Sequence, residues 1–316
     1  MSLALLFSPQ GSQFVGMGRD LAEAIPASRA VYDAADAALG WSVSATCFEG
    51  PEERLNDTRQ TQPCLVATSL AALAALRSRV QVTASHLAGH SVGEYAALAA
   101  AGVLSVEDAL RLVARRGALM AEQSTEGGMT AVIGLAREVV AAAIDAIASP
   151  ADLVVANDNA PGQVVISGTR EALLAAETSL RAAGARRLIP LKVSGPFHSP
   201  HMAEVCDMLE RAFADATWHE PNVPVVSNVS AAPERDVARL RNLLAEQVRS
   251  SVEWVASVRR MIDEGVDTFI ECGAGNALSG MIRRIAPEAR TLAVSDLATL
   301  EATVGHLSSQ PAAALA

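Results

Sequence analysis

The sequence predicts an α/β protein in which a large domain with a mostly parallel sheet carries a smaller inserted domain. Short buried strands alternate with helical segments through most of the 316 residues, a pattern that favours parallel strands covered by helices on both faces. Between residues 127 and 194 the expected order changes to strand, helix, two strands, helix and strand, which is the order of a ferredoxin-like unit. We therefore predict a large domain over residues 1–126 and 195–307, a small domain over residues 127–194 and a disordered tail over residues 308–316.

The large domain is expected to begin with a strand. Leu3–Phe7 is a short apolar run typical of a buried strand, and His86–His90 is a second one that leads into a tight turn. Apolar spacing and good helix formers predict the helices between and after these strands. The expected helices are Thr68–Val80, Val92–Ala101, Val106–Gln123, Met202–Ala214, Val237–Val248 and Val252–Glu264, and the later strands are Val223–Asn228 and Thr268–Glu271.

The small domain is expected to contain four strands and two helices. A loop with Pro161 and Gly162 joins its two middle strands, and Gly184 ends its second helix. The expected strands are Met129–Leu135, Leu153–Asn157, Gln163–Ser167 and Arg186–Val193, and the helices are Arg137–Ile147 and Arg170–Ala183.

Charge and composition restrict the possible partners. The net charge of −10 argues against nonspecific binding of nucleic acid, because such binding needs a basic surface. An acidic protein partner would be repelled overall and would need a local patch of arginines. Half of the residues are hydrophobic and 19% are charged, which is typical of a globular protein.

Cysteine spacing and hydropathy bear on the compartment. The four cysteines form no CxxC pair, so we expect no structural zinc and interpret them as buried thiols in a reducing compartment. The first residues lack the charged start and the cleavage site of a signal peptide. No apolar run is long enough to span a bilayer. We therefore expect a cytoplasmic protein, and we expect it to be a monomer.

The segment Gly89-His90-Ser91-Val92-Gly93 is the sharpest local signal of chemistry. A GxSxG between a strand and a helix is the pattern of a nucleophile elbow, whose glycines permit a tight turn that exposes the serine hydroxyl. Free N–H groups at the start of the helix can then stabilise an oxyanion. The alternative is a chance GxSxG in a glycine-containing loop, since the pattern by itself is common.

A serine hydroxyl needs a base, and His198 is the best of the six histidines. It follows an expected strand, and Gly195 and Pro196 before it fix a loop from which a catalytic side chain can project. His90 adjoins Ser91, so we expect its side chain to point away from the serine. We interpret His86 as a core or edge residue and expect at most a minor role for His201.

Two segments resemble the malonyl-CoA:acyl carrier protein transacylases and the acyltransferase domains of polyketide synthases. The similarity is carried by GHSVGEYAAL from Gly89 and by VSGPFHSPHM from Val193. Further matches follow in order along nearly the whole chain: Phe7–Gln13, Gln60–Pro63, Arg115–Gly117, Asn157–Gln163 and Glu271–Gly275. The resemblance implies a large hydrolase-like α/β domain with a ferredoxin-like insert, in agreement with the fold class above.

The same resemblance implies an activity and roles for particular residues. A malonyl group would move from malonyl-CoA to the phosphopantetheine thiol of an acyl carrier protein through an ester on Ser91, with ping-pong kinetics. His198 would be the general base, and the N–H groups of Gln10 and Val92 the oxyanion hole. Arg116 would pair with the malonyl carboxylate, because burying that charge without a partner costs several kcal/mol. The main-chain carbonyl of Gln247 would orient His198, which gives a dyad.

Arg116 and Phe197 would set specificity. Arg115 and Arg116 are separated by about 100° on a helix, so at most one faces the pocket, and only the family match favours Arg116. Phe197 before the histidine is the pattern associated with malonyl over methylmalonyl, although it could be a plain core residue. The sequence departs from the family at Pro9 and at His201, where glycine and leucine are frequent.

Carrier docking would need positive charge near the mouth of the site. We expect Arg283 and Arg284 to lie on the helix after the Glu271–Gly275 loop, near the edge of the sheet that carries Ser91. Three further candidates flank the expected strand that leads to His198. The candidate docking residues are Arg283, Arg284, Arg186, Arg187 and Lys192.

Several alternatives stay open. A serine esterase or thioesterase would use the same elbow but would want an acid and then a histidine late in the chain, where only His306 is found. Within the transferases, fatty-acid synthesis is favoured over a stand-alone polyketide acyltransferase and a malonyl-loading subunit of malonate decarboxylase. No P-loop or complete GxGxxG is present, and too little chain follows Gly275 for a further βαβ pair, so we expect no cofactor and no metal.

Overall fold

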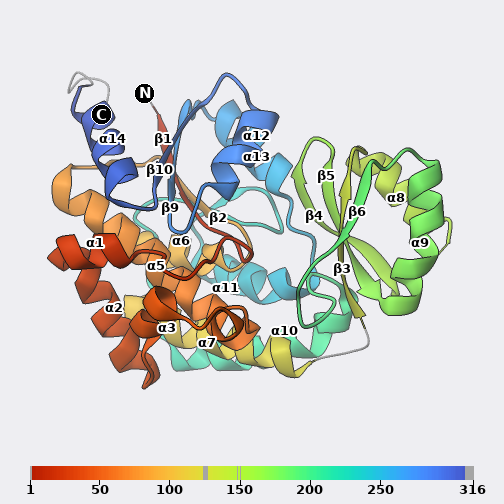
Figure 1. Cartoon of the computed structure of the whole chain (residues 1–316), viewed down its shortest axis with the longest axis horizontal. Helices are drawn as coiled ribbons and strands as arrows, with labels where there is room; N and C mark the ends of the chain where they lie inside the picture. The colour runs from red at the N-terminus through yellow and green to blue at the C-terminus, as the bar shows by residue number, and fades with distance from the viewer. Residues whose placement is uncertain (1, 124–126, 148, 150, 310–316) are drawn as a thin grey trace.

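The large sheet is mostly parallel and has β1 near its centre. The computed structural model describes residues 2–123, 127–147, 149 and 151–309. The strands of this sheet are β1 (Leu3–Phe7), β2 (His86–Gly89), β7 (Val225–Val226), β8 (Pro233–Glu234), β9 (Thr268–Cys272) and β10 (Arg290–Val294). They lie in the order β10-β9-β1-β2-β7-β8, with β8 antiparallel to β7 and the other neighbours parallel (Figure 1).

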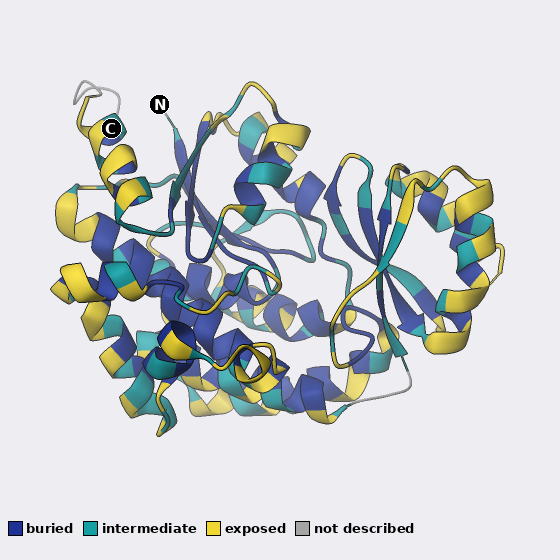
Figure 2. Cartoon of the chain, viewed as in Figure 1, coloured by how far each residue is buried: buried dark blue, intermediate teal, exposed yellow. Residues whose placement is uncertain are grey.

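Helices cover both faces of this sheet, because side chains along β1 alternate between two apolar clusters. Leu5 lies in the larger cluster and Leu6 in the other. The larger cluster includes residues of α2 (Pro26–Leu39), α5 (Thr58–Arg79), α6 (Gly93–Ala100) and α7 (Val106–Glu122). The second cluster includes residues of α12 (Trp254–Asp263) and α13 (Ala277–Ile285). Figure 2 shows the central strands as buried throughout.

The small sheet is antiparallel and has its own apolar cluster. Its strands are β3 (Gly127–Ile133), β4 (Leu153–Ala160), β5 (Gln163–Thr169) and β6 (Arg187–Pro190), and its helices are α8 (Arg137–Asp145) and α9 (Arg170–Ala182). The order β4-β5-β3-β6 follows from two interleaved βαβ units, as in a ferredoxin-like unit. The predicted fold class is therefore confirmed.

Hydrogen bonds join the small sheet to the large domain. The N–H of Val252 donates to the carbonyl of Ala156 in β4 at 2.8 Å. The guanidinium of Arg284, in the last turn of α13, donates to the side chain of Gln163 at 2.7 Å. The side chain of His90, in the turn that follows β2, also lies 2.7 Å from the side chain of Asn159 in β4, so the small sheet lies beside that turn.

The helix α5 begins at Thr58, well before the expected start at Thr68. The side chain of Asp57 caps it by accepting a hydrogen bond from the N–H of Arg59 at 2.9 Å. Polar residues such as Gln62 are buried in its first turns, so those turns lack the apolar pattern that identified the rest of the helix.

The ends of the chain contain elements that apolar spacing did not predict. They include β10 and the helices α1 (Arg19–Ala24), α3 (Val43–Glu49), α4 (Glu52–Leu55) and α14 (Leu297–Ser308). The chain after Gly275 forms α13, one further strand, β10, and α14. The expected tail begins inside α14, and residues 310–316 lie outside the described part of the chain. The remaining helices are α10 (Ala203–Ala212), α11 (Val237–Glu246) and the short 3-10 turns η1 (Pro200–Met202), η2 (Phe213–Asp215) and η3 (Gln247–Arg249).

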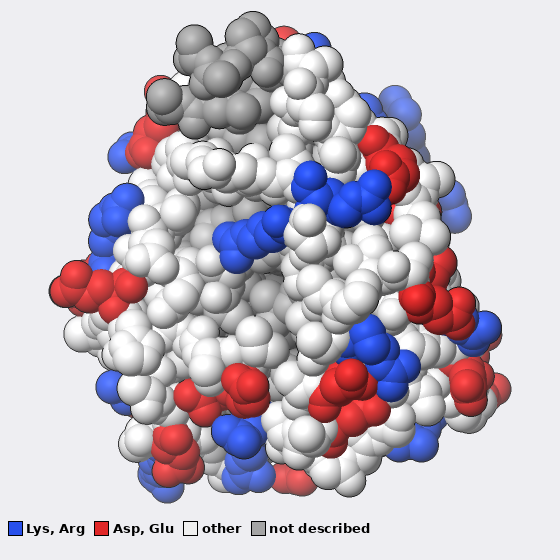
Figure 3. Space-filling view, turned by 90° about the vertical axis from the view of Figure 1, so that its left-hand side faces the viewer, with Lys and Arg blue, Asp and Glu red and all other residues white. Residues whose placement is uncertain are grey.

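Surface and composition offer few other features. Among the described residues, no helix is long and apolar enough to cross a membrane, and no group of acidic, histidine and cysteine side chains could hold a metal ion. The four cysteines are free and buried. On the face shown in Figure 3, acidic and basic side chains are interspersed.

Candidate active site

Ser91 lies on a tight turn between β2 and α6. Its φ angle of 52° is in the left-handed region, which side-chain residues rarely adopt. A Cβ added to Gly89 would lie 2.0 Å from the main chain of Gly93, and a Cβ added to Gly93 would lie 2.3 Å from the carbonyl oxygen of Phe7. Both glycines are therefore needed for β2 to turn into α6 against β1, and this turn presents the Ser91 hydroxyl at the start of the helix.

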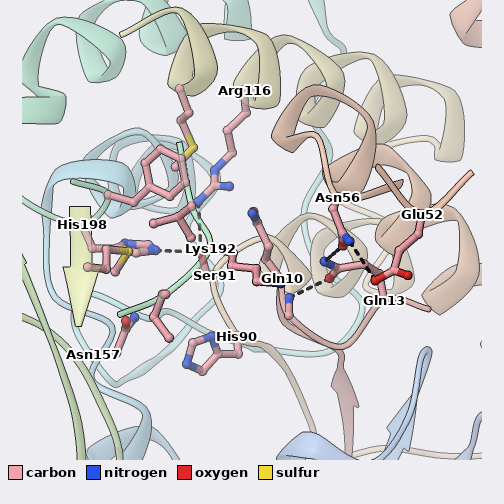
Figure 4. Close-up of a pocket in the computed structure, with 16 residues that line it drawn as sticks. Gln10, Gln13, Glu52, Asn56, His90, Ser91, Arg116, Asn157, Lys192 and His198 are labelled. Atoms are coloured by element: carbon pink, nitrogen blue, oxygen red, sulfur yellow. Dashed lines mark hydrogen bonds between the residues drawn. The ribbon is translucent and has the colours of Figure 1, made fainter. Parts of the chain in front are cut away.

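Ser91 and His198 form a hydrogen-bonded pair. The Oγ of Ser91 lies 2.8 Å from Nε2 of His198 (Figure 4). On the other side of the ring, Nδ1 of His198 lies 2.8 Å from the carbonyl oxygen of Gln247 and 3.2 Å from that of Ser250. Because a carbonyl oxygen only accepts, Nδ1 carries the proton and donates it. Nε2 is then the acceptor, and the Ser91 hydroxyl donates to it.

The surroundings keep His198 neutral. Burial, and then the positive charge of Arg116, lower the pKa of His198 to about 3. The main chain also fixes the position of His198, since the main-chain N–H of His198 donates to the carbonyl of Val248 at 2.8 Å. A neutral imidazole aimed at a hydroxyl is able to accept the serine proton.

Arg116 is buried beside the serine, whereas the neighbouring Arg115 on α7 is exposed. One guanidinium nitrogen donates to the side-chain oxygen of Gln62 at 2.8 Å. The other donates to the side-chain oxygen of Gln247 at 3.0 Å and to Oγ of Ser91 at 3.1 Å. A fixed cation that donates a hydrogen bond to the serine can receive a carboxylate on the acyl group.

The serine, the histidine and the arginine open into one pocket of about 420 Å³. Gln10, Met120, Phe197 and Lys192 are among the residues that line it (Figure 4). Among the described residues, the main-chain N–H groups of Gln10 and Val92 have no hydrogen-bond acceptor. These free donors are available for an oxyanion at the turn.

Two amide side chains hold the elbow in place. Asn228 accepts from the N–H of Ser91 at 2.6 Å and donates to the carbonyl of Gly89 at 2.7 Å. The amide nitrogen of Gln247 donates to the carbonyl of Ser91 at 3.0 Å and to the carboxylate of Glu94 at 2.6 Å. The strained turn is therefore fixed on both sides by side chains from distant parts of the chain.

Sequence reasoning missed four contributors to this site. Gln62 and Glu94 stand inside the segments that carry the resemblance, but no role was expected for them. The side chain of Gln247 was also missed, because only its main-chain carbonyl was expected to act. Asn228 ends an expected strand, and a polar residue at the carboxyl end of a parallel strand was the one signal that could have indicated it.

The other histidines near the site have different partners. Nε2 of His90 lies 2.7 Å from the side-chain oxygen of Asn159, and the ring packs near Trp254 with the centroids 5.4 Å apart. Burial lowers the pKa of His90 to about 4. His201 lies in the turn η1 before α10.

The expected docking residues are divided between the pocket and other contacts. Lys192 is exposed and lines the pocket. The other four, which are also exposed, are Arg186, Arg187, Arg283 and Arg284. Arg284 donates to Gln163 of the small sheet, as described above, and Arg283 donates to the hydroxyl of Thr291 at 3.2 Å. A docking role for these residues stays a prediction.

A known protein family matches nearly the whole chain. The acyl transferase domain family matches residues 4–302. The chain is 41% identical over 308 residues to the malonyl CoA-acyl carrier protein transacylase of Bacillus subtilis. The aligned residues cover 96% of this chain and 97% of that protein.

Two solved structures superpose on nearly the whole chain. An acyl carrier protein S-malonyltransferase from Vibrio cholerae has a TM-score of 0.93 at 38% identity, over 96% of this chain and 100% of that chain. A malonyl-transacylase in complex with its type II PKS acyl-carrier protein has a TM-score of 0.93 at 38% identity, over 97% of this chain and 100% of that chain. The resemblance noted in the sequence is thus confirmed, and the chain belongs to the acyl transferase domain family, among relatives that are malonyl CoA-acyl carrier protein transacylases.

Proposed function

We propose that the protein is an acyltransferase that moves a malonyl group from malonyl-CoA to the phosphopantetheine thiol of an acyl carrier protein. The observation that carries this proposal is a buried cation at a serine–histidine pair. Arg116 lies 3.1 Å from the same Oγ of Ser91 that lies 2.8 Å from His198. An acyl group on Ser91 would therefore carry its carboxylate into the reach of Arg116.

In the first half-reaction Ser91 attacks the thioester carbon of malonyl-CoA. Nε2 of His198 takes the hydroxyl proton as the Oγ–C bond forms, and the N–H groups of Gln10 and Val92 stabilise the oxyanion. When the C–S bond breaks, His198 gives its proton to the departing sulfur. The products are the Ser91 malonyl ester and free coenzyme A.

In the second half-reaction the carrier thiol replaces coenzyme A. His198 takes the thiol proton, the sulfur attacks the ester carbon, and the proton returns to Oγ of Ser91 as the ester bond breaks. The carbonyl of Gln247 holds the His198 ring for both proton transfers. Phe197, which lies in the pocket wall, narrows the space beside the α-carbon and favours malonyl over a branched acyl group.

The chemistry needs no cofactor, because every proton and acyl transfer has a protein group to perform it. We place the reaction in the cytoplasm and in fatty-acid synthesis. A polyketide acyltransferase or a malonyl-loading subunit of malonate decarboxylase would use the same steps.

A serine hydrolase is the alternative from another class. Hydrolases with this elbow orient the histidine with a carboxylate. Here Nδ1 of His198 faces two main-chain carbonyls instead. This arrangement favours the dyad of a transferase. Incubation with malonyl-CoA without carrier protein separates the two, since a hydrolase turns over and a transferase stops at the acyl-enzyme.

Intact-protein mass spectrometry tests the proposal directly. After mixing with malonyl-CoA, the protein should gain one malonyl group, which acyl carrier protein should then remove. The Ser91→Ala variant should gain none. An adduct that persists in this variant would assign the acyl group to another residue.

A further inference from the structure

Glu94 is a buried carboxylate that the mechanism above does not use. It lies in the first turn of α6 and is 1% exposed. Its Oε2 accepts hydrogen bonds from the side chain of Gln247 at 2.6 Å and from the main-chain N–H of Asn228 at 3.2 Å. Its Oε1 is buried and has no hydrogen-bond partner among the described residues. A carboxylate with one unpaired oxygen is costly to bury, so its retention calls for a compensating charge.

The compensating charge is Arg116, and the side chain of Gln247 connects the two groups. Within the described residues, the hydrogen bonds of Arg116 go to Gln62, Gln247 and Ser91, none of which is anionic. The amide oxygen of Gln247 accepts from Arg116 at 3.0 Å while its nitrogen donates to Glu94. A guanidinium only donates and a carboxylate only accepts, so this amide orientation alone satisfies both groups. Glu94 thus balances the cation in the free enzyme.

A malonyl carboxylate on Arg116 would introduce a second anion into this cluster. One guanidinium would then face two carboxylates in a buried site, and like charges disfavour each other's ionised form. Burial already raises the pKa of Glu94 to about 7, although Gln247, Asn228 and Arg116 oppose the shift. The additional anion would raise it further and make the acid form of Glu94 the stable one at neutral pH.

The other titratable groups around the cluster do not compete for this proton at neutral pH. The pKa of His198 is lowered to about 3 and that of His90 to about 4, in both cases chiefly by burial. Burial raises the pKa of Tyr95, the neighbour of Glu94 on α6. These groups stay neutral, and Arg116 stays charged.

We propose that Glu94 is an exchangeable counter-charge of Arg116, which balances the guanidinium in the free enzyme and takes up a proton from solvent when a malonyl carboxylate binds there. This inference rests on the proposed function. It makes Glu94 a determinant of how strongly the site holds a charged acyl group, because binding the carboxylate includes the cost of protonating Glu94. Neutral acyl groups should be unaffected by the state of Glu94.

Proton uptake on acylation is the direct test. The enzyme is mixed with malonyl-CoA at pH 7 in weak buffer with a pH indicator, and the uptake is divided by the amount of ester found by mass. We expect about half a proton per malonyl ester in the natural protein. With acetyl-CoA, which forms the same ester without the carboxylate, we expect no uptake. The acetyl arm also corrects for ionisation of the released thiol, and it needs no variant.

The Glu94→Gln variant identifies the group that takes up the proton. Glutamine keeps an oxygen for Gln247 and Asn228 but does not titrate, so uptake on malonylation should disappear. Uptake that persists in this variant would place the proton on another group, such as His198, and would overturn the inference. Equal uptake with malonyl-CoA and acetyl-CoA in the natural protein would also overturn it.

The pH dependence of KM provides a second readout. Above about pH 7 the KM for malonyl-CoA should rise by up to about tenfold per pH unit in the natural protein, because Glu94 must be reprotonated. It should stay flat and lower in Glu94→Gln. A flat profile in the natural protein contradicts the inference. A malonyl ester that forms without proton uptake refutes only this inference, whereas failure to form the ester on Ser91 refutes the proposed function.

Discussion

A buried histidine makes a hydrogen bond at each end of strand β2, and the two histidines have different partners. At its start, His86 contacts the carboxylate of Glu264 at 2.8 Å and the hydroxyl of Ser85 at 3.0 Å. After its end, Ser91 faces His198, whose other nitrogen faces main-chain carbonyls. The partner of His86 is the carboxylate of Glu264, which is partly exposed to solvent. The partner of His198 is the hydroxyl of Ser91, which lines a pocket.

This difference decides which histidine can perform catalysis. The hydrogen bond from His86 is the first cause of the lowered pKa of Glu264, so that contact stabilises a charge at the surface. In the other pair, burial and Arg116 keep the imidazole of His198 neutral, with a lone pair directed at the serine. A histidine with a carboxylate partner is structural here, while one that keeps a free lone pair for a nucleophile is a base.

Alanine at each histidine tests this contrast most strongly. His198→Ala should lower kcat by about 10⁴-fold or more, because the serine loses its base. His86→Ala should leave kcat within about threefold and instead lower the free energy of unfolding by about 1–3 kcal/mol, since buried hydrogen bonds are lost. Malonyl transfer rates and urea unfolding measure both effects. If His86→Ala loses as much activity as His198→Ala, the two ends of the strand are not functionally distinct.

The arginines of α7 allow a second matched test at the serine end. Arg116→Ala should lose about 2–4 kcal/mol in kcat/KM for malonyl-CoA, as for a truncated buried charge pair, while acetyl transfer holds or improves. Arg115→Ala, on the exposed side of the same helix, should change neither by more than about 0.5 kcal/mol. Equal losses with malonyl-CoA and acetyl-CoA would make Arg116 a structural residue.

The sequence predicted the turn that carries Ser91 better than it predicted the polar groups that support this turn. Leu3–Phe7 and the GxSxG turn are local signals, since apolar runs and paired glycines depend on neighbours in the chain. The clamp on Ser91 is not local. Asn228 and Gln247 reach it from far along the sequence, and only the packed fold shows which of their polar atoms face the turn.

Burial of polar residues explains why the predicted start of α5 was too late. The first turns of α5 carry Gln62 and Thr61, which are buried because they surround the arginine and the turn before the helix. Periodicity of apolar residues cannot detect such turns. The same property hid Glu94, whose buried carboxylate lies on an otherwise apolar helix. The functional site is thus where the sequence pattern departs from the simple rule of apolar residues inside.

The pH dependence of stability offers a third test, through His90. Burial lowers the pKa of this histidine to about 4 from its ordinary value of 6.5. A histidine with a lowered folded pKa contributes stability that is complete above the unfolded pKa and is lost as the pH falls from about 6.5 to about 4. That loss is at most about 1.4 kcal/mol per pH unit. In His90→Asn, the free energy of unfolding measured in urea should fall less steeply with decreasing pH, by up to this amount per pH unit. An unchanged pH dependence would contradict burial of His90 in its neutral form.

The smallest expected effect concerns exposed charge at the two ends of β2. Lys192 lines the pocket at the serine end, and Arg260 contacts Glu264 at the His86 end. Acyl carrier proteins of this kind are acidic, so Lys192→Glu should raise the KM for the carrier, whereas Arg260→Glu should not. An exposed pair contributes about 0.2–1 kcal/mol, which limits the increase to about fivefold.

Salt and substrate choice separate docking from other effects of Lys192→Glu. Screening should raise the KM of the natural protein for the carrier as ionic strength increases, and the difference from the variant should shrink. Malonyl-pantetheine, which lacks the phosphates of coenzyme A, should acylate Ser91 equally fast in both proteins. An unaltered KM for the carrier in Lys192→Glu would show that the carrier does not dock at Lys192, and would leave the other exposed arginines as candidates. A slower reaction of this variant with malonyl-pantetheine would mean that Lys192 acts inside the pocket and not on the carrier.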